Sequence, residues 1–154
     1  MEKKIKKYIY LVILLLIAVS CDDLSFKKEL CDKINPDNVT SLKYEYDICS
    51  IKRRNDYYMI YNPEGNREII LSLKNDRFYY KNYYSKRDSV EINAIVDVLR
   101  IIDKYKVYEL YISDSCHYYI FRNRSMIVYR PNIDVKNNTD AIKLKDNWYY
   151  YERN

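Results

Sequence analysis

The sequence predicts an α+β domain, in which a mostly antiparallel sheet of about 7–8 short strands carries one long amphipathic helix (residues 88–105) and a short N-terminal helix. Several short segments alternate apolar and polar side chains, which is the pattern of a half-buried strand. Short turns separate most of these segments and favour antiparallel neighbours. Strands grouped on either side of one long helix then favour a helical layer packed on a sheet.

Residues 24–34 form the first predicted element, a short helix in which apolar side chains recur at helical spacing. The Asn-Pro-Asp sequence at residues 35–37 is a turn signal, which ends the helix. From Ser41 the hydrophobic period changes to two, and apolar side chains alternate with charged ones as far as Ile48. This alternation predicts the first strand of the sheet.

Further segments have the alternation or the short apolar run that is typical of strands. These predicted strands are residues 57–61, 68–73, 77–84, 107–112, 116–122, 125–130 and 148–151. Gly65 supplies the positive φ of a tight turn at residues 63–66. Asn123 and Arg124 form a two-residue hairpin connection, and residues 131–146 are a polar loop. The last predicted strand is an edge strand.

The clearest helix lies between these groups of strands, at residues 88–105. Asp88 can cap its first turn, and Glu91 three residues later completes a capping box. The apolar side chains fall on one face of the helix, so this face must lie against the sheet. They are Ile92, Ile95, Val96, Leu99 and Ile102.

The formal charge of +5 is concentrated at the start of the chain. Residues 1–20 carry four lysines against one glutamate, a net +3, which leaves +2 for residues 21–154. A charge of this size is ordinary for a soluble surface, so the sequence predicts no nucleic-acid partner. The chain has 20 tyrosines against 3 phenylalanines, which favours rings that lie on an apolar surface with their hydroxyl groups in water.

The first twenty residues have the form of a secretory signal. A basic start is followed by an unbroken apolar run at residues 8–19. As a helix this run is about 18 Å long, against a bilayer core of about 30 Å. It is therefore too short to span a membrane and suits a signal peptide.

The residues at the end of this run, Ala18-Val19-Ser20-Cys21, resemble the lipobox of bacterial lipoproteins. Val19, Ser20 and Cys21 match the lipobox, whereas Ala18 stands where leucine is commonest. The resemblance implies cleavage before Cys21, a diacylglycerol group on its sulfur and a fatty acid such as palmitate on the new N-terminus. More than one acyl chain makes an anchor stable, so the resemblance implies a lipid bilayer as the first partner.

The same resemblance divides the chain into a cleaved signal peptide (residues 1–20) and a single globular domain (residues 21–154), in which residues 21–40 hold the tether and the short helix. It implies a location in the cell envelope, with the outer membrane or the cell surface favoured. The inner membrane is the alternative, because bacteria differ in how they interpret acidic residues such as Asp22 and Asp23 beside the acylated cysteine.

Three cysteines remain after Cys21, and outside the cytoplasm an odd number predicts one disulfide and one buried thiol. A Cys31–Cys49 disulfide would close a loop of about 18 residues, worth about 3 kcal/mol, and would join the first helix to the sheet. A Cys49–Cys116 disulfide between two strands is the alternative. Three free thiols are expected if the host is an anaerobe.

Cys116 and His117 are the one adjacent pairing of cysteine and histidine, and His117 is the one histidine of the sequence. Neighbours on a strand point to opposite faces, so the two side chains cannot act together as nucleophile and base. We expect a core cysteine and a surface or cross-strand histidine. Metal-ligand spacings are absent, and a single glycine argues against a phosphate-binding loop. The sequence therefore predicts no metal, no cofactor and no enzyme.

Paired aromatic residues on several strands predict a surface that stacks on a glycan or docks a protein. The candidate binding residues are Tyr79, Tyr83, Trp148, Tyr150, Arg122 and Arg124. Arg77 and Arg130 extend the same anion-binding rim. Simple filling of the sheet by aromatic pairs across strands is the structural alternative.

The sequence therefore predicts a non-catalytic, membrane-anchored envelope lipoprotein that uses an aromatic-rich sheet to bind an envelope protein or glycan. One alternative is an inhibitor or immunity lipoprotein that neutralises a toxin or hydrolase. The other is an envelope glycan hydrolase, which requires a deep pocket with two carboxyl groups about 5–9 Å apart.

Overall fold

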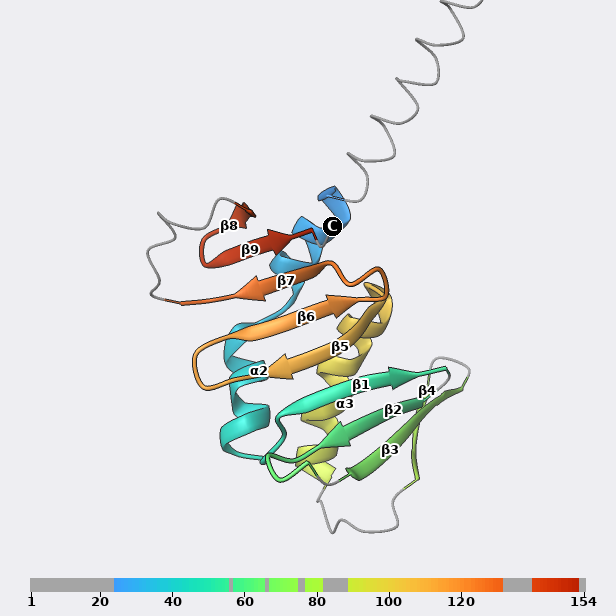
Figure 1. Cartoon of the computed structure of the whole chain (residues 1–154). Helices are drawn as coiled ribbons and strands as arrows, with labels where there is room; N and C mark the ends of the chain where they lie inside the picture. Colours follow the sequence, from blue (N-terminus) through green and yellow to red (C-terminus); the bar gives the residue numbers. More distant parts are fainter. Residues whose placement is uncertain are drawn as a thin grey trace, which may run out of the picture.

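The computed structural model describes residues 24–55, 57–65, 67–74, 77–81, 89–131 and 140–152. Within these residues, helices pack on one face of a nine-stranded antiparallel sheet, and the protein has the predicted α+β fold (Figure 1). No helix in these ranges is both long enough and apolar enough to cross a membrane.

The helices are residues 24–33, α2 (Pro36–Tyr44) and α3 (Ser89–Lys104). The strands are β1 (Ser50–Arg54), β2 (Tyr57–Tyr61), β3 (Arg67–Lys74), β4 (Arg77–Lys81), β5 (Val107–Ile112), β6 (His117–Phe121), β7 (Met126–Tyr129), β8 (Ala141–Lys145) and β9 (Trp148–Tyr151). Their order in the sheet is β4-β3-β2-β1-β5-β6-β7-β9-β8, and every pair of neighbours is antiparallel. For β3 and β4 the structure describes the backbone alone. The first helix, the long helix and most of the strands agree with the sequence prediction.

The predicted turn at residues 35–37 and the predicted strand at residues 41–48 are wrong, because helix α2 occupies most of this segment. The Oδ1 atom of Asn35 accepts a hydrogen bond from the backbone N–H of Asp37 at 2.9 Å and so caps the helix. Pro36 fits the first turn, where a backbone N–H would have no helical partner. The three residues that signal a turn are therefore also a signal for the start of a helix.

Two strands lie where the sequence predicts none. β1 contains a single apolar residue, Ile51, yet it lies inside the sheet between β2 and β5. β8 lies within the predicted loop at residues 131–146 and pairs with β9. The prediction that residues 148–151 form an edge strand is therefore wrong, since β9 has β7 on one side and β8 on the other.

The core lies between the helices and the face of the sheet that they cover (Figure 1). Helix α3 buries Ile95, Leu99 and Ile102 of its predicted apolar face, whereas Ile92 and Val96 of the same face are half-buried. It also buries Val98, which the prediction leaves out. The predicted cap at Asp88 lies outside the described residues. Because α3 is held against the sheet in this way, the turn that follows it is positioned at the end of the sheet.

Candidate anion-binding site

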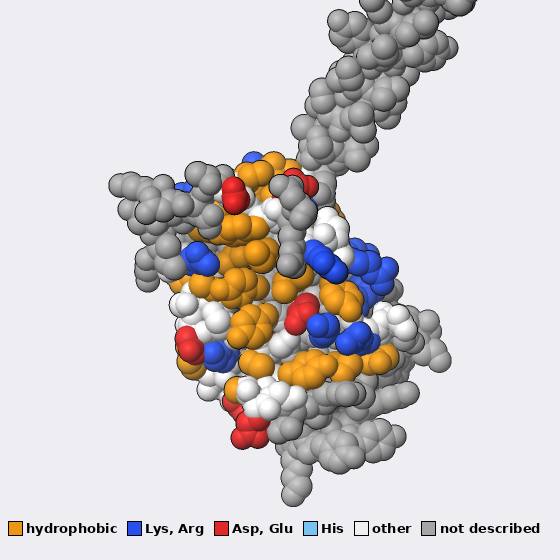
Figure 2. Space-filling view, viewed as in Figure 1, with side chains coloured by type: hydrophobic (Ala, Val, Ile, Leu, Met, Phe, Trp, Pro, Cys, Tyr) orange, Lys and Arg blue, Asp and Glu red, His pale blue; other side chains and the backbone are white. Residues whose placement is uncertain are grey.

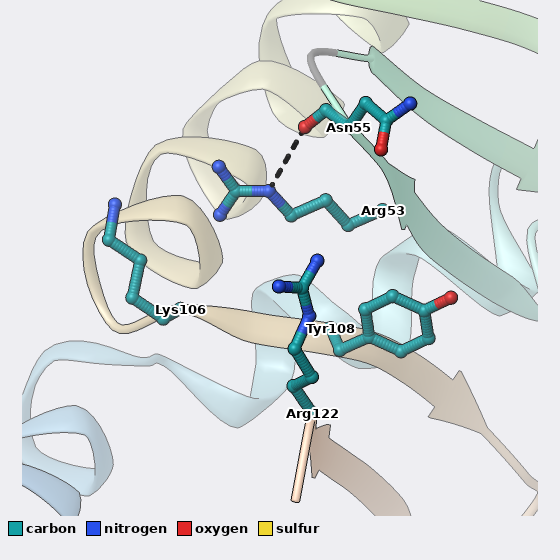
Figure 3. A pocket seen from close by; sticks show the side chains of 5 residues that line it. All are labelled: Arg53, Asn55, Lys106, Tyr108 and Arg122. Carbon is teal, nitrogen blue, oxygen red and sulfur yellow. Dashed lines mark hydrogen bonds between the residues drawn. The ribbon is translucent and has the colours of Figure 1, made fainter.

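A hollow lies where the ends of β1 and β6 meet the start of β5 (Figure 3). Its volume is about 360 Å³, and it is lined by Arg53, Asn55, Lys106, Tyr108 and Arg122. Figure 3 shows Arg122 pointing toward the side chain of Arg53, whose own guanidinium group is directed toward α3, with Lys106 on the turn that follows α3. We call this space the basic hollow.

A second hollow of about 360 Å³ adjoins the basic hollow, because Tyr108 and Arg122 line both of them. Its other lining residues are Glu109, Ile120, Phe121 and Arg124. The two hollows together connect cations at the strand ends with aromatic and aliphatic side chains of β5 and β6. Such a surface suits a ligand that has a charged group attached to a less polar body.

The last turn of α3 holds Arg53 in place. The Nη1 atom of Arg53 lies 2.9 Å from Oδ1 of Asp103, and its Nε atom donates to the backbone carbonyl of Asn55 at 3.5 Å (Figure 3). The hydroxyl group of Tyr58 donates to the same Asp103 oxygen at 2.7 Å. Burial and this hydrogen bond raise the pKa of Tyr58. The packing of α3 on the sheet therefore fixes one wall of the basic hollow.

The two hollows carry an excess of positive charge. Their cations are Arg53, Lys106, Arg122 and Arg124. Glu109 is the one carboxylate among the lining residues, and Lys52 lies 2.7 Å from it, while Asp103 balances Arg53. Within the described chain, the other three lining cations have no carboxylate partner. Three uncompensated charges at one place exceed the net +2 of residues 21–154 as a whole.

Two of these cations stand at backbone positions that usually require glycine. Lys106 follows the end of α3 with a φ of 56°, and Arg124 closes the β6–β7 turn with a φ of 67°. A side chain in this left-handed region costs about 1 kcal/mol. The other described non-glycine residues with positive φ are Asp47, Asn55 and Asn147, which are types that tolerate it. Backbone strain of this kind is typical of functional sites. Here both strained residues, Lys106 and Arg124, are cations that line the hollows.

Residues 122–125 separate β6 from β7, which is a longer connection than the predicted two residues, and Ser125 pairs with Phe121 at its base. The N–H of Phe121 donates to the carbonyl of Ser125 at 2.9 Å, and the N–H of Arg124 donates to the carbonyl of Phe121 at 3.0 Å. Residues 122–124 therefore form the loop, with the left-handed residue last, as is usual for a loop of this length. This geometry brings the first and the last residue of the loop to the same pair of hollows.

The face of the sheet opposite the helices carries rows of hydrophobic side chains (Figure 2). Tyr111 is 45% exposed on this face, and its ring lies 5.8 Å from that of Tyr118 on the neighbouring strand. Lysine and arginine side chains gather to the right of these rows in the view of Figure 2. We call this side of the sheet the open face.

The aromatic part of the predicted binding surface is corrected by the structure at two positions. Trp148 and Tyr150 are 3% and 4% exposed and lie in the core, so neither can contact a partner in solution. Successive side chains of β9 point to opposite faces, and alternation alone does not say which face is covered. Tyr79 lies in β4, where only the backbone is described, and Tyr83 lies outside the described residues.

Unlike Trp148 and Tyr150, the two arginines of the predicted binding surface do line a hollow in the structure. Arg122 and Arg124 line the hollows, whereas Arg130 lies at the other end of the β6–β7 pair and contacts Cys116. Sequence reasoning missed Arg53 and Lys106. A cation directly after a long helix, where glycine is expected, is the one sequence signal that could have indicated Lys106.

The structure contains neither of the two predicted disulfides, since Cys31, Cys49 and Cys116 are free thiols. The thiol of Cys31 donates to the carbonyl of Lys27 at 3.3 Å, and burial raises its pKa to about 12. The thiol of Cys49 donates to the carbonyl of Asn62 at 3.0 Å. The third alternative, in which all three thiols are free, is the arrangement that the structure has.

Cys116 and His117 have different partners. Burial raises the pKa of Cys116, but hydrogen bonds, the largest of them with Ser115, outweigh burial and lower it. His117 is 5% exposed, its Nε2 atom lies 3.2 Å from Oγ1 of Thr40, and its ring stands 5.3 Å from that of Tyr129 across the strands. The histidine is therefore a cross-strand residue in the core, and the surface alternative is wrong.

Comparison of the chain with protein-family models, curated proteins and solved structures gave no match. Nor do the described residues include a group of three or more His, Cys, Asp or Glu side chains placed to hold a metal ion. The proposal for its function therefore starts from the two hollows and from the resemblance of residues 1–21 to a lipoprotein signal.

Proposed function

We propose that this chain is a lipid-anchored, non-catalytic protein of a bacterial cell envelope that binds an anionic group of a partner molecule in the basic hollow. The observation that carries the proposal is that three cations from separate parts of the chain, Arg53, Lys106 and Arg122, line one hollow (Figure 3). The lipobox that ends at Cys21 supports a place in the envelope, with an envelope protein or glycan as the partner.

The chemistry of the hollow favours a carboxylate or a phosphate. Guanidinium groups donate paired hydrogen bonds to the oxygens of such groups, and two guanidinium groups that face one space repel each other when it holds no anion. Among the cations that line the described part of the hollow, Asp103 is paired with Arg53 alone. An anion in the hollow would accept hydrogen bonds from Arg122 and Lys106, and the ring of Tyr108 would contact the body that carries it.

The lining suits binding better than glycoside hydrolysis. Hydrolysis requires two carboxyl groups on opposite sides of the reacting bond. The described lining of the two hollows contains Glu109 as its carboxylate, and Lys52 holds that carboxylate at 2.7 Å. The geometry therefore supports a binding role over the hydrolase alternative.

The proposal is tested by titrating the purified full chain, in neutral detergent, with inorganic phosphate and with a sugar phosphate. NMR records the amide signals of the residues that line the hollow. We expect saturable shifts of the Lys106 and Arg122 signals. The Arg122→Gln variant should bind about tenfold more weakly or worse, because the loss of a hydrogen bond between charged groups costs about 1.5–3 kcal/mol.

Two further variants separate binding from folding. Arg130→Gln removes the same charge at the other end of the hairpin and should leave the affinity unchanged. Arg124→Gly should weaken binding yet raise the free energy of unfolding by about 1 kcal/mol, because glycine relieves the left-handed strain. Absence of saturable shifts, or equal losses in Arg122→Gln and Arg130→Gln, would contradict the proposal.

A further inference from the structure

The basic hollow lies next to the first helix of the folded chain. The ring of Phe26 stands 4.9 Å from that of Tyr105. The carboxylate of Glu29 accepts a hydrogen bond from the Tyr105 hydroxyl at 2.7 Å and lies 3.2 Å from Nζ of Lys104. These two partners directly precede Lys106, which lines the hollow. The first helix therefore packs against the turn that forms part of the hollow's wall.

The second hollow also adjoins this helix. The ammonium group of Lys27 lies 5.7 Å from the centroid of the Phe121 ring, and Phe121 lines the second hollow. Phe26 itself is 37% exposed, so a large apolar ring faces solvent at this end of the domain. Cations and an exposed aromatic ring together are typical of a surface that meets the headgroup layer of a membrane.

The position of Cys21 in the sequence keeps this surface close to the bilayer. Phe26 follows Cys21 by five residues, and an extended chain spans at most about 3.6 Å per residue. The two Cα atoms are therefore at most about 18 Å apart. If Cys21 carries acyl chains, the hollows are held near the headgroup layer, where lipid phosphates are the most concentrated anions.

We propose that the basic hollow binds the phosphate group of an anionic phospholipid in the same membrane that holds Cys21. The proposal rests on the proposed function and names its anionic group. The acyl chains already attach the protein, so the effect of the hollow is to fix the orientation of the domain on the bilayer. Each cation near an anionic surface strengthens association about fivefold, so Lys106, Arg122 and Arg124 together contribute about 100-fold.

The test uses the acylated protein in nanodiscs, with the amide signals of Lys106, Arg122 and Arg124 followed by NMR. Discs of phosphatidylcholine alone are compared with discs that contain increasing fractions of phosphatidylglycerol. We expect saturable shifts of these signals only with phosphatidylglycerol. In Arg122→Gln the lipid fraction needed for half of the shift should rise about fivefold, whereas in Arg130→Gln it should not change.

A further arm separates this inference from the proposed function. Inorganic phosphate is added to the discs of phosphatidylcholine alone. Shifts with free phosphate but none with phosphatidylglycerol would overturn the phospholipid inference and leave anion binding standing. Shifts in neither arm would overturn both. Equal responses of Arg122→Gln and Arg130→Gln to phosphatidylglycerol would show general attraction to charge and would also overturn the inference.

Discussion

Lowering the pH from 7 to 4 is expected to reduce the free energy of unfolding by about 3 kcal/mol through one residue, His117. Burial lowers the pKa of this histidine from 6.5 to about 4. Between these two values the unfolded chain binds a proton that the folded protein does not bind. The contribution of the neutral His117 to the free energy of unfolding is therefore fully present above pH 6.5. It is lost as the pH falls from 6.5 toward 4.

The surroundings of His117 explain why its charged form is excluded. Its Nδ1 atom has no hydrogen-bond partner among the described residues, and Nε2 contacts the hydroxyl of Thr40 at 3.2 Å. The carboxylate of Asp37 favours the charged form, but burial has the larger effect. Protonation would thus place a charge in the core with an unpaired N–H group, which is costly.

The measurement is urea unfolding of the normal chain and of His117→Phe at several pH values. Phenylalanine keeps a ring beside Tyr129 but cannot take up a proton. Acidic side chains change both proteins alike, so the difference between the two curves reports the histidine. We expect the normal chain to lose about 3 kcal/mol more than the variant between pH 7 and pH 4. Parallel curves would contradict this account of His117.

Replacing Trp148 by alanine is expected to cost about 3–5 kcal/mol of unfolding free energy, because the indole ring fills the core between strands and helices. Trp148 is 3% exposed, and its ring lies 5.4 Å from that of Tyr119 and 5.0 Å from that of Tyr129. Removing it leaves a cavity that these neighbours can fill only in part.

Tyr151→Ala is the matched control on the same strand, since this tyrosine is the partly exposed residue of β9. We expect its cost to be below about 1 kcal/mol. Urea unfolding of both variants compares a core aromatic residue with a partly exposed one three positions away. A small cost for Trp148→Ala, together with a weakened ligand response, would support a binding surface that includes Trp148 and contradict its place in the core.

The fold class and the long helix were predictable, because their hydrophobic periods are regular over many residues. The start of α2 was not, since an Asn-Pro-Asp sequence is equally a turn and a capped helix start. β1 was missed because Ile51 is its one apolar residue. Its charged residues have partners on other elements, such as Glu109 for Lys52 and Asp103 for Arg53. The hydrophobic pattern of one strand gives no information about such partners.

The basic hollow shows the same limit for the site. Arg122 and Arg124 lie close together in the sequence and were predicted together. Arg53 and Lys106 are far from them along the chain, and they meet Arg122 only because β1 pairs with β5 and β5 pairs with β6. Strand pairing over this distance depends on the whole core. The left-handed backbone at Lys106 likewise appears only once the end of α3 is placed.

The central claim is that acyl chains on Cys21 place this domain at a membrane, and intact-mass analysis of the native protein tests it most directly. The account predicts a mature chain that starts at Cys21 and carries the mass of a diacylglycerol group and an amide-linked fatty acid. It also predicts that Cys21→Ser removes both. A native chain that retains Met1, or a mature start without fatty acid, would contradict the claim.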